Sequence, residues 1–359
     1  MFGFKNTKRH RGLINGLAVS PGGDRMITGA EGSGDRDGLV WKLPSLSVVG
    51  ELHGHPGGIR SAAWSRSGRL VVTGANPAVP RLGIKADPFP VRLWDADSCR
   101  QSGELEVPLR SVRALAVSND DKLLLTGGQG GEEYGLALFR LWDLQDKVEL
   151  LRFGQQRTSV ESVAFSPDGR LVACGCFVQF NQQRALFSGG AAQPTVYSPD
   201  PASGVRTLRL FELQGGREIE QFEYFECVNS IKFTPDGRHL LSIGKEYLLW
   251  NVDSGRQVFR FQPAESSWAN SGDISADGRL VAIGCGDQID YGRYRDCCVR
   301  VWRFEAPKEI AVFPHKRYVN RLAFVPGANL VVAAGDNAEV HIWSFEEAEI
   351  MEARGQTAI

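Results

Sequence analysis

Seven polar residues recur at one equivalent position of a repeated pattern and are the first candidates for chemistry in this chain. Each lies at the start of a strand-like segment that is otherwise mostly apolar. The residues are Asn15, Arg60, Arg113, Glu161, Asn229, Asn270 and Asn320. Asn and Arg side chains form hydrogen bonds in several directions, which suits recognition of a peptide backbone. A polar wall around a water-filled channel is an interpretation of equal weight.

A second group combines arginine with aromatic residues. It lies in the segments 8–11, 291–295 and 315–318, and next to the entrance of the sixth repeat. Arginine beside aromatic rings is typical of the central residues of protein interfaces and also suits stacked nucleobases. Ordinary solvated surface charge is the alternative. The residues predicted to bind a partner here are Trp268, Arg293, Arg295, Arg317 and Tyr318.

The sequence contains no pattern that indicates catalysis, a cofactor or a metal site. Among the seven equivalent residues only Glu161 is a carboxylate, and the six His are scattered. The Gly-x-Gly at Gly284–Gly286 opens no helix, so it does not resemble a dinucleotide site. The seven Cys include Cys174 and Cys176, but no second ligand pair follows at zinc-site spacing. We therefore expect a protein that is not an enzyme and has buried free thiols.

Composition restricts the class of protein further. The net charge of −1 argues against a nucleic-acid or membrane surface spread over the whole molecule, though not against a local patch. No apolar run reaches about 18 residues and the first residues lack an apolar signal core, so export and membrane spanning are not indicated. Together with the unpaired Cys, these features favour the cytoplasm.

The elements that position these residues follow from a sevenfold repeat. Each unit has an apolar segment, a turn such as Ser-Pro-Asp-Gly-Arg, a second apolar segment, a variable loop and a segment ending in an aromatic residue. The turns begin at Ser20, Ser65, Ser118, Ser166, Thr234, Ser275 and Val325, and the aromatic residues are Trp41, Trp94, Trp142, Phe211, Trp250, Trp302 and Trp343. Units of this length, each too small to bury its own apolar face, indicate a propeller or an array.

Each unit is expected to form four antiparallel strands. In the fourth repeat the strands are predicted at Ser159–Phe165, Leu171–Cys176, Arg206–Glu212 and Glu218–Phe222, because β-formers dominate there and turn residues separate them. No segment except Glu346–Arg354 has helical periodicity. The sequence thus predicts an all-β fold, with one domain over residues 1–359.

Individual motifs resemble a known family. Leu-Trp-Asp at Leu93–Asp95 and Leu141–Asp143, the pair Gly54-His55 and the Ser-Pro-Asp-Gly turns are similar to the WD-repeat β-propeller family. This resemblance implies a closed ring of seven four-stranded blades. It also implies that an N-terminal strand, here Phe2–Lys5, completes the last blade; completion by Ala348–Ala353 is the alternative. The equivalent polar residues would then surround the mouth of a central channel.

The chain departs from the family's polar network, which joins a loop His, a strand Ser or Thr, a loop Asp and the Trp. Blade one supplies His10, Thr28, Asp37 and Trp41. Blade two has His55, Thr73 and Trp94, with Pro90 where the Asp would be, and blade seven has His315 and Trp343 but Ala334 for the hydroxyl. The other blades lack the His. These departures indicate a divergent member of the family, of bacterial type, whose blades depend more on packing.

Loop lengths indicate which face binds. The connections between second and third strands are long at Asn76–Pro90, Phe177–Val205 and Asp287–Cys298, whereas the turns at the other end are minimal. Loops beyond about 12–15 residues are usually functional or disordered. We expect the long-loop side, called the top face in this family, to be the binding face; tolerated drift in loop length is the alternative.

These observations favour a non-catalytic scaffold that binds a protein partner, as a subunit of a larger complex, through the top face. A nucleic-acid-binding propeller that uses the basic and aromatic residues of blades six, seven and one is the first alternative. A propeller hydrolase is the least favoured, since no acid–base constellation is present.

One pair of residues breaks the repeat together. Five repeats have Ala at one position near the end of the first strand, namely Ala18, Ala63, Ala116, Ala164 and Ala323. The fifth and sixth repeats have Lys232 and Asp273 instead. Because these repeats are consecutive and a lone buried charge is costly, we expect an ion pair between them.

Overall fold

The computed structural model describes residues 5–8, 10–31, 37–55, 57–75, 90–129, 137–155, 159–177, 206–219, 222, 224, 226–261, 268–290, 293–304 and 308–345. All regular elements in these ranges are β-strands. Within them, no helix has the length and apolarity needed to cross a membrane.

The first four repeats each contribute four strands. Repeat one has β2 (Leu13–Val19), β3 (Arg25–Glu31), β4 (Gly38–Lys42) and β5 (Ser47–Leu52). Repeat two has β6 (Ile59–Trp64), β7 (Leu70–Ala75), β8 (Pro90–Asp95) and β9 (Gln101–Glu106). Repeat three has β10 (Ser111–Val117), β11 (Leu123–Gln129), β12 (Ala137–Asp143) and β13 (Glu149–Gln155). Repeat four has β14 (Ser159–Phe165), β15 (Leu171–Phe177), β16 (Leu208–Glu212) and β17 (Glu218–Ile219).

The last three repeats follow the same order. Repeat five has β18 (Val228–Phe233), β19 (His239–Gly244), β20 (Tyr247–Asn251) and β21 (Gln257–Phe261). Repeat six has β22 (Ala269–Ile274), β23 (Leu280–Asp290), β24 (Arg293–Arg303) and β25 (Lys308–Pro314). Repeat seven has β26 (Val319–Phe324), β27 (Leu330–Gly335) and β28 (Glu339–Ser344), and β1 (Lys5–Lys8) lies beside β28.

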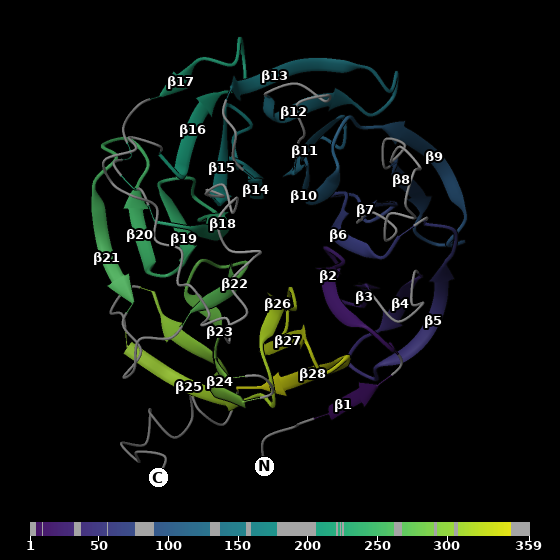
Figure 1. Ribbon diagram of the computed structural model, residues 1–359, viewed down its shortest axis with the longest axis vertical. Coiled ribbons are helices and arrows are strands. Elements are labelled where there is room, and N and C mark those ends of the chain that lie inside the picture. The colour runs from purple at the N-terminus through teal and green to yellow at the C-terminus, as the bar shows by residue number, and fades with distance from the viewer. Residues whose placement is uncertain are drawn as a thin grey trace, which may run out of the picture.

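The strands form antiparallel sheets arranged around a common centre, with the first strand of each repeat innermost (Figure 1). Five sheets have four strands, including β1-β28-β27-β26. An eight-stranded sheet contains repeats three and four, which are joined by the single residue pair Gln129–Ser159. Such short antiparallel sheets follow from tight turns between strands of about six residues.

Turn chemistry explains why the first and second strands reverse so sharply. In repeat four the Ser166 amide donates to the Leu171 carbonyl, and the Gly169 amide donates to the Ser166 carbonyl, both at 2.9 Å. The Ser166 hydroxyl donates to Asp168 at 2.6 Å. Gly169 has a φ of 70°, a left-handed conformation that glycine adopts without steric strain.

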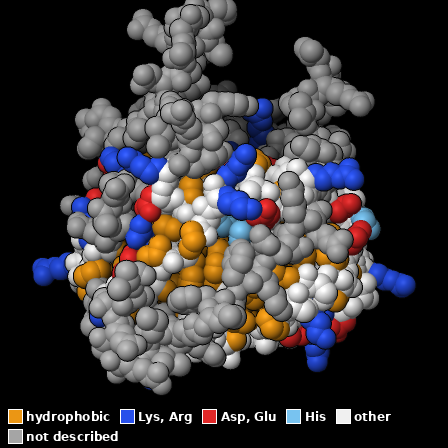
Figure 2. Space-filling model, turned by 90° about the horizontal axis from the view of Figure 1, so that it is seen from below, with side chains coloured by type: hydrophobic (Ala, Val, Ile, Leu, Met, Phe, Trp, Pro, Cys, Tyr) orange, Lys and Arg blue, Asp and Glu red, His pale blue; other side chains and the backbone are white. Residues whose placement is uncertain are grey.

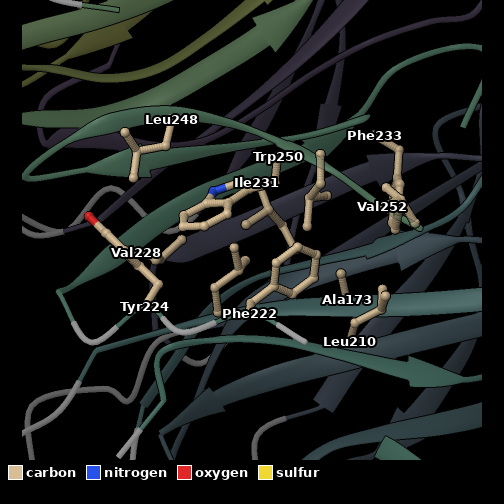
Figure 3. Packing of buried hydrophobic residues seen from close by; sticks show 12 residues of the cluster. Ala173, Leu210, Phe222, Tyr224, Val228, Ile231, Phe233, Leu248, Trp250 and Val252 are labelled. Atoms are coloured by element: carbon tan, nitrogen blue, oxygen red, sulfur yellow. The ribbon is translucent and has the colours of Figure 1, made fainter. Parts of the chain in front are cut away.

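The apolar core lies between neighbouring sheets. In the cluster between repeats four and five, Phe222 lies between Trp250 on one side and Ala173 and Leu210 on the other (Figure 3). The rings of Phe222 and Trp250 meet edge to face at 5.6 Å. Because each sheet buries apolar residues against the next, adjacent repeats depend on each other for their core.

Three sequence expectations can be compared with these bounds. The first strand of repeat four is as predicted, whereas β16 begins two residues later than expected and β17 is described only to Ile219. β1 covers Lys5–Lys8 and shares only Lys5 with the predicted N-terminal strand. The loop expected at Asp287–Cys298 is largely a hairpin, because β23 and β24 pair out to Asp290 and Arg293. The segments 346–354 and 348–353 lie outside the described residues.

Candidate functional site

A β-bulge places each of the seven equivalent polar residues. In repeat one the pairing passes from Ile14–Ala30 to Gly16–Gly29, so Asn15 has no partner in β3. The same interruption occurs at the other six residues, Arg60, Arg113, Glu161, Asn229, Asn270 and Asn320. A bulge inserts one extra residue into one strand and redirects its side chain. The repeated bulge explains why a polar residue is accepted there in otherwise apolar strands.

The bulge residues contact neighbouring repeats. The side-chain amide Nδ2 of Asn15 donates to Glu31, and Arg60 Nη1 of the next repeat lies 3.0 Å from the same carboxylate. Arg113 forms an ion pair with Glu161 of the following repeat. These residues therefore connect repeat one to repeat two and repeat three to repeat four.

The asparagines make similar connections farther round. Asn229 Nδ2 donates to the Ala269 carbonyl at 3.0 Å. Asn320 Nδ2 donates to Asp336 at 2.7 Å and lies 3.4 Å from the Ile14 carbonyl of repeat one. Burial raises the pKa of Asp336. Part of the hydrogen-bonding capacity of this ring is thus used within the molecule.

The inner strands surround a channel. Its volume is about 780 Å³, and residues from all seven inner strands line it. The bulge residues lie at the end of these strands that pairs with the last residues of the second strands, from which the second-to-third connections leave. The minimal hairpin turns lie at the opposite end. This arrangement places the bulge residues on the side where the long connections were predicted.

Arg321 is a charged residue of this channel that the sequence interpretation missed. It follows the bulge residue Asn320, and its Nη1 donates to the Asn320 carbonyl at 2.8 Å. Burial and the positive charges of Arg60 and Arg113 lower its pKa to about 10, while Glu161 and Glu31 oppose that shift. Arg321 is therefore within electrostatic range of charged residues from the first four repeats.

The predicted ion pair between repeats five and six is confirmed. Lys232 Nζ lies 3.0 Å from Asp273 Oδ1, and the carboxylate raises the pKa of Lys232. The two side chains differ in burial, with 51% exposure for Lys232 and 11% for Asp273. Asp273 Oδ2 also accepts from the Phe324 amide of repeat seven at 2.9 Å. Asp273 thus connects three repeats, of which the sequence indicated two.

In repeats one and two, a Thr hydroxyl joins the His and the Trp of the predicted polar network. Thr28 Oγ1 lies 2.8 Å from His10 Nε2 and 2.6 Å from Trp41 Nε1. Thr73 makes the same contacts with His55 and Trp94 at 2.7 and 2.8 Å. Burial, with a contribution from Arg92, lowers the pKa of His55 to about 3, so this imidazole is neutral.

Two features differ from the family pattern, namely the contact of Asp37 in repeat one and the aromatic packing in repeat seven. Asp37 lies 3.0 Å from His53 Nδ1. In repeat seven, where Ala334 replaces the hydroxyl, His341 stacks on Trp343 with an interplanar angle of 17°. His315 packs against His341 at 4.5 Å between ring centroids. The sequence interpretation missed the role of His341, and also the Trp142–Thr126 and Trp250–Ser242 hydrogen bonds of repeats three and five.

Buried arginines on third strands are a second missed feature. Arg140, Arg209 and Arg300 each lie two residues before the aromatic residue of their repeat and are at least 90% buried. Each forms an ion pair with a fourth-strand carboxylate, respectively Glu149, Glu218 and Glu309. The signal was present in the sequence as Arg-x-Trp or Arg-x-Phe followed by Glu.

The basic and aromatic residues of repeats six and seven are partly brought together. The Gly286 amide donates to the Trp268 carbonyl at 2.9 Å, and a Cβ on Gly286 would lie 3.1 Å from the Tyr318 ring. Arg295 and Arg317 are exposed, and the side chain of Arg293 lies outside the described residues. Figure 2, which views the side of β25, β28 and β1, shows Lys and Arg side chains on several sides of an apolar area.

Other chemistry is limited among the described residues. In them, no group of three or more His, Cys, Asp or Glu side chains is placed to hold a metal ion. None of the seven Cys, all of which lie in the described residues, forms a disulfide, and five are buried. Cys174 and Cys176 are on the same side of β15, with their sulfurs 3.8 Å apart, and burial raises the pKa of Cys174.

Comparison with known protein families agrees with this geometry. The model of the WD domain, G-beta repeat, matches residues 46–76, 148–177 and 307–344. Each matched segment contains a fourth strand and at least the next two strands along the chain. These three segments match WD repeats.

Two curated proteins are similar to this chain at low sequence identity. The transcription factor unc-37 of Caenorhabditis elegans is 24% identical over 300 residues, which cover 78% of this chain and 46% of unc-37. The protein groucho of Drosophila melanogaster is 24% identical over 246 residues, covering 64% of this chain and 31% of groucho. This chain thus spans less than half the length of these relatives.

Proposed function

We propose that residues 1–359 form one closed, seven-bladed propeller that acts as a non-catalytic scaffold. Its partner is a protein, and the chain is a subunit of a larger complex. Binding occurs on the face from which the second-to-third connections leave. The observation that carries this proposal is the approach of the Trp268 backbone and the Tyr318 ring to Gly286, with exposed Arg295 and Arg317 in the same two repeats.

Contacts between repeats seven and one support the closed ring. β1 pairs with β28 in the register Lys5–Ile342 to Lys8–Glu339. At the opposite end of the inner strands, a Cβ on Gly23 would lie 2.3 Å from the Pro326 carbonyl oxygen. Asn320 approaches the Ile14 carbonyl between the inner strands. The N-terminal strand therefore completes the sheet of the last repeat, and residues of the last repeat contact the first repeat at two further places.

The contacts of the carboxylate at the channel mouth support a scaffold rather than an enzyme. Glu161, the one carboxylate among the bulge residues, pairs with Arg113 and also accepts from the Ser159 hydroxyl at 2.7 Å. A carboxylate already engaged by an arginine and a hydroxyl is not free to act on a substrate as an acid or base. Arginine with Trp and Tyr is the composition that dominates binding energy at protein interfaces.

A nucleic-acid partner is the alternative, because the exposed arginines could also bind phosphate groups. Such binding weakens steeply with salt because condensed counterions are released. A protein interface with one small charged patch depends less on salt. The salt dependence of binding therefore separates the two partner classes.

The test uses charge reversal on the two ends of the molecule. The double variant Arg295→Glu with Arg317→Glu is compared with Arg238→Glu with Arg279→Glu, which lie in exposed hairpin turns at the other end and are 77% and 79% exposed. Partners are captured from the native source, and the rates at which they associate with and dissociate from each variant are then measured. We expect the first variant to slow association about tenfold or more and the second to leave it unchanged.

Two results would contradict this assignment. Weaker capture by the hairpin-turn variant, with normal capture by Arg295→Glu and Arg317→Glu, would move the binding face to the other end. Capture that is abolished by nuclease, with a steep salt dependence, would replace the protein partner by a nucleic acid.

A further inference from the structure

We infer that the channel mouth binds one carboxylate group, through Arg321 together with Arg113. The occupant would be an acidic side chain of the protein partner, so this inference rests on the proposed function and specifies its ligand. No residue of the basic group on repeats six and seven is part of this site.

The position of Arg321 in the repeat is the first observation. The residue directly after the bulge is Gly16, Ser61, Ala114, Ser162, Ser230 or Ser271 in the other repeats. Arg321 is the exception, and it lines the channel. Because six small residues meet the packing needs of this position, the ring does not require a long cationic side chain there.

The charges around Arg321 are the second observation. Two carboxylates, Glu31 and Glu161, lie in ion pairs with Arg60 and Arg113, respectively. Burial is the main cause that lowers the pKa of Arg321 to about 10; Arg60 and Arg113 also lower it, and Glu161 and Glu31 oppose the shift. The site therefore holds three guanidinium groups against two carboxylates, which leaves one positive charge without a counterpart in this set.

The available donors are the third observation. A guanidinium has five N–H donors in a planar fork, and Arg321 Nη1 donates to its neighbour's carbonyl. Arg113 and Arg321 both line the channel, so two guanidinium groups border the same space.

Charge balance and shape select the ligand. One carboxylate would neutralise the remaining positive charge and match the guanidinium fork in a bidentate way. A phosphate monoester, with a charge of about −1.5 to −2 at neutral pH, would leave the group negative. The bulge asparagines beside the site suit the backbone of the peptide that carries the acidic side chain.

The test measures binding of small probes by ligand-observed NMR at constant ionic strength. The probes are N-acetyl-glutamate N-methylamide, its uncharged glutamine analogue, succinate and inorganic phosphate. We expect the glutamate probe to bind at least tenfold more tightly than the glutamine probe, since a charged hydrogen bond is lost in the latter. Arg321→Ser, which installs the residue found in repeats two, four, five and six, should weaken the glutamate probe at least tenfold.

Matched variants keep the test decisive. Arg279→Ser removes an exposed arginine from a hairpin turn at the opposite end of the inner strands. This variant should leave probe binding unchanged. Arg321→Lys keeps the charge but not the fork and should bind between wild type and Arg321→Ser. Unchanged thermal unfolding of Arg321→Ser would show that the loss of binding does not come from unfolding.

The outcomes separate this inference from the proposed function. Equal binding of the glutamate and glutamine probes, or undiminished binding by Arg321→Ser, would overturn the carboxylate site even where partner capture is normal. Tighter binding of phosphate would overturn the ligand class, and tighter binding of succinate than of the glutamate probe would replace the partner side chain by a free small acid. Normal probe binding with capture unaffected by Arg295→Glu and Arg317→Glu would instead overturn the proposed binding face.

Discussion

Asp273 shows how one buried carboxylate can connect several repeats. Its Oδ1 faces Lys232 of repeat five, and its Oδ2 accepts from the Phe324 amide of repeat seven. Asp273 is buried, whereas half of the Lys232 side chain is exposed to the channel. The amide contact is therefore expected to contribute at least as much stability as the half-exposed ion pair.

Replacement of Asp273 tests this division. Asp273→Ala should lower the free energy of unfolding by about 2–4 kcal/mol, because it leaves both the Phe324 amide and Lys232 without their acceptor. Lys232→Ala should have a clearly smaller effect, and the double variant should recover only part of the loss, since the amide remains unpaired. Urea unfolding of the three variants measures these differences. Equal losses in the two single variants would show that the ion pair dominates.

The first strands of repeats five to seven also show which residues the sequence could and could not predict. Lys232 and Asp273 were predicted to pair because the repeat alignment places them at one position in consecutive units. Arg321 escaped notice because it follows a bulge, and the extra residue shifts which side chains face the channel. Alternation of apolar and polar residues cannot reveal a bulge, since the bulge is the place where alternation fails.

At the scale of strands and sheets, the fourth repeat illustrates what short-range pattern can predict. β14 and the start of β15 follow directly from β-branched and aromatic residues on either side of a Ser-Pro-Asp-Gly turn. The network of Arg209 and Glu218 was not predicted, because an arginine in a strand is normally taken as exposed. In the structure Arg209 Nε donates to Glu218 at 2.7 Å, and the Arg209 side chain is 8% exposed.

Two ion pairs of this repeat make a matched comparison. Glu218→Ala should lower the free energy of unfolding by about 3 kcal/mol, because it removes the carboxylate paired with a buried guanidinium. Glu212→Ala removes the partner of Arg217, whose side chain is 72% exposed, and should have little effect. Chemical denaturation of both variants provides the measurement. Similar losses would mean that the Arg209 pair is no stronger than a surface pair.

At the scale of the whole molecule, the contact between the first and last repeats determines whether the ring is closed. Gly23 and Gly169 occupy the same place in their turns and both have a φ of 70°. A Cβ on Gly169 would have no atom within 4 Å, whereas a Cβ on Gly23 would lie 2.3 Å from the Pro326 oxygen. The two glycines thus differ only in what lies across the turn.

Alanine at these positions separates the conformational effect from the closure contact. Gly169→Ala should lower the free energy of unfolding by about 1–2 kcal/mol, from the left-handed conformation alone. Gly23→Ala should lower it by about 2 kcal/mol more, because a backbone atom of the last repeat has to move. Parallel thermal and urea unfolding measures the difference. Indistinguishable variants would indicate that repeats seven and one are not in contact at these turns.

The repeated bulge has a consequence for how such a molecule can diversify. A residue outside the hydrogen-bonded ladder can be exchanged without changing the register of the strand that carries it, so mutations there leave the strand pairing intact. Asn15, Arg60 and Glu161 already show three chemically different side chains in one structural setting. The mouth of the channel is therefore a natural place to engineer new specificity, by combinatorial libraries that randomise the bulge positions while every strand keeps its pairing.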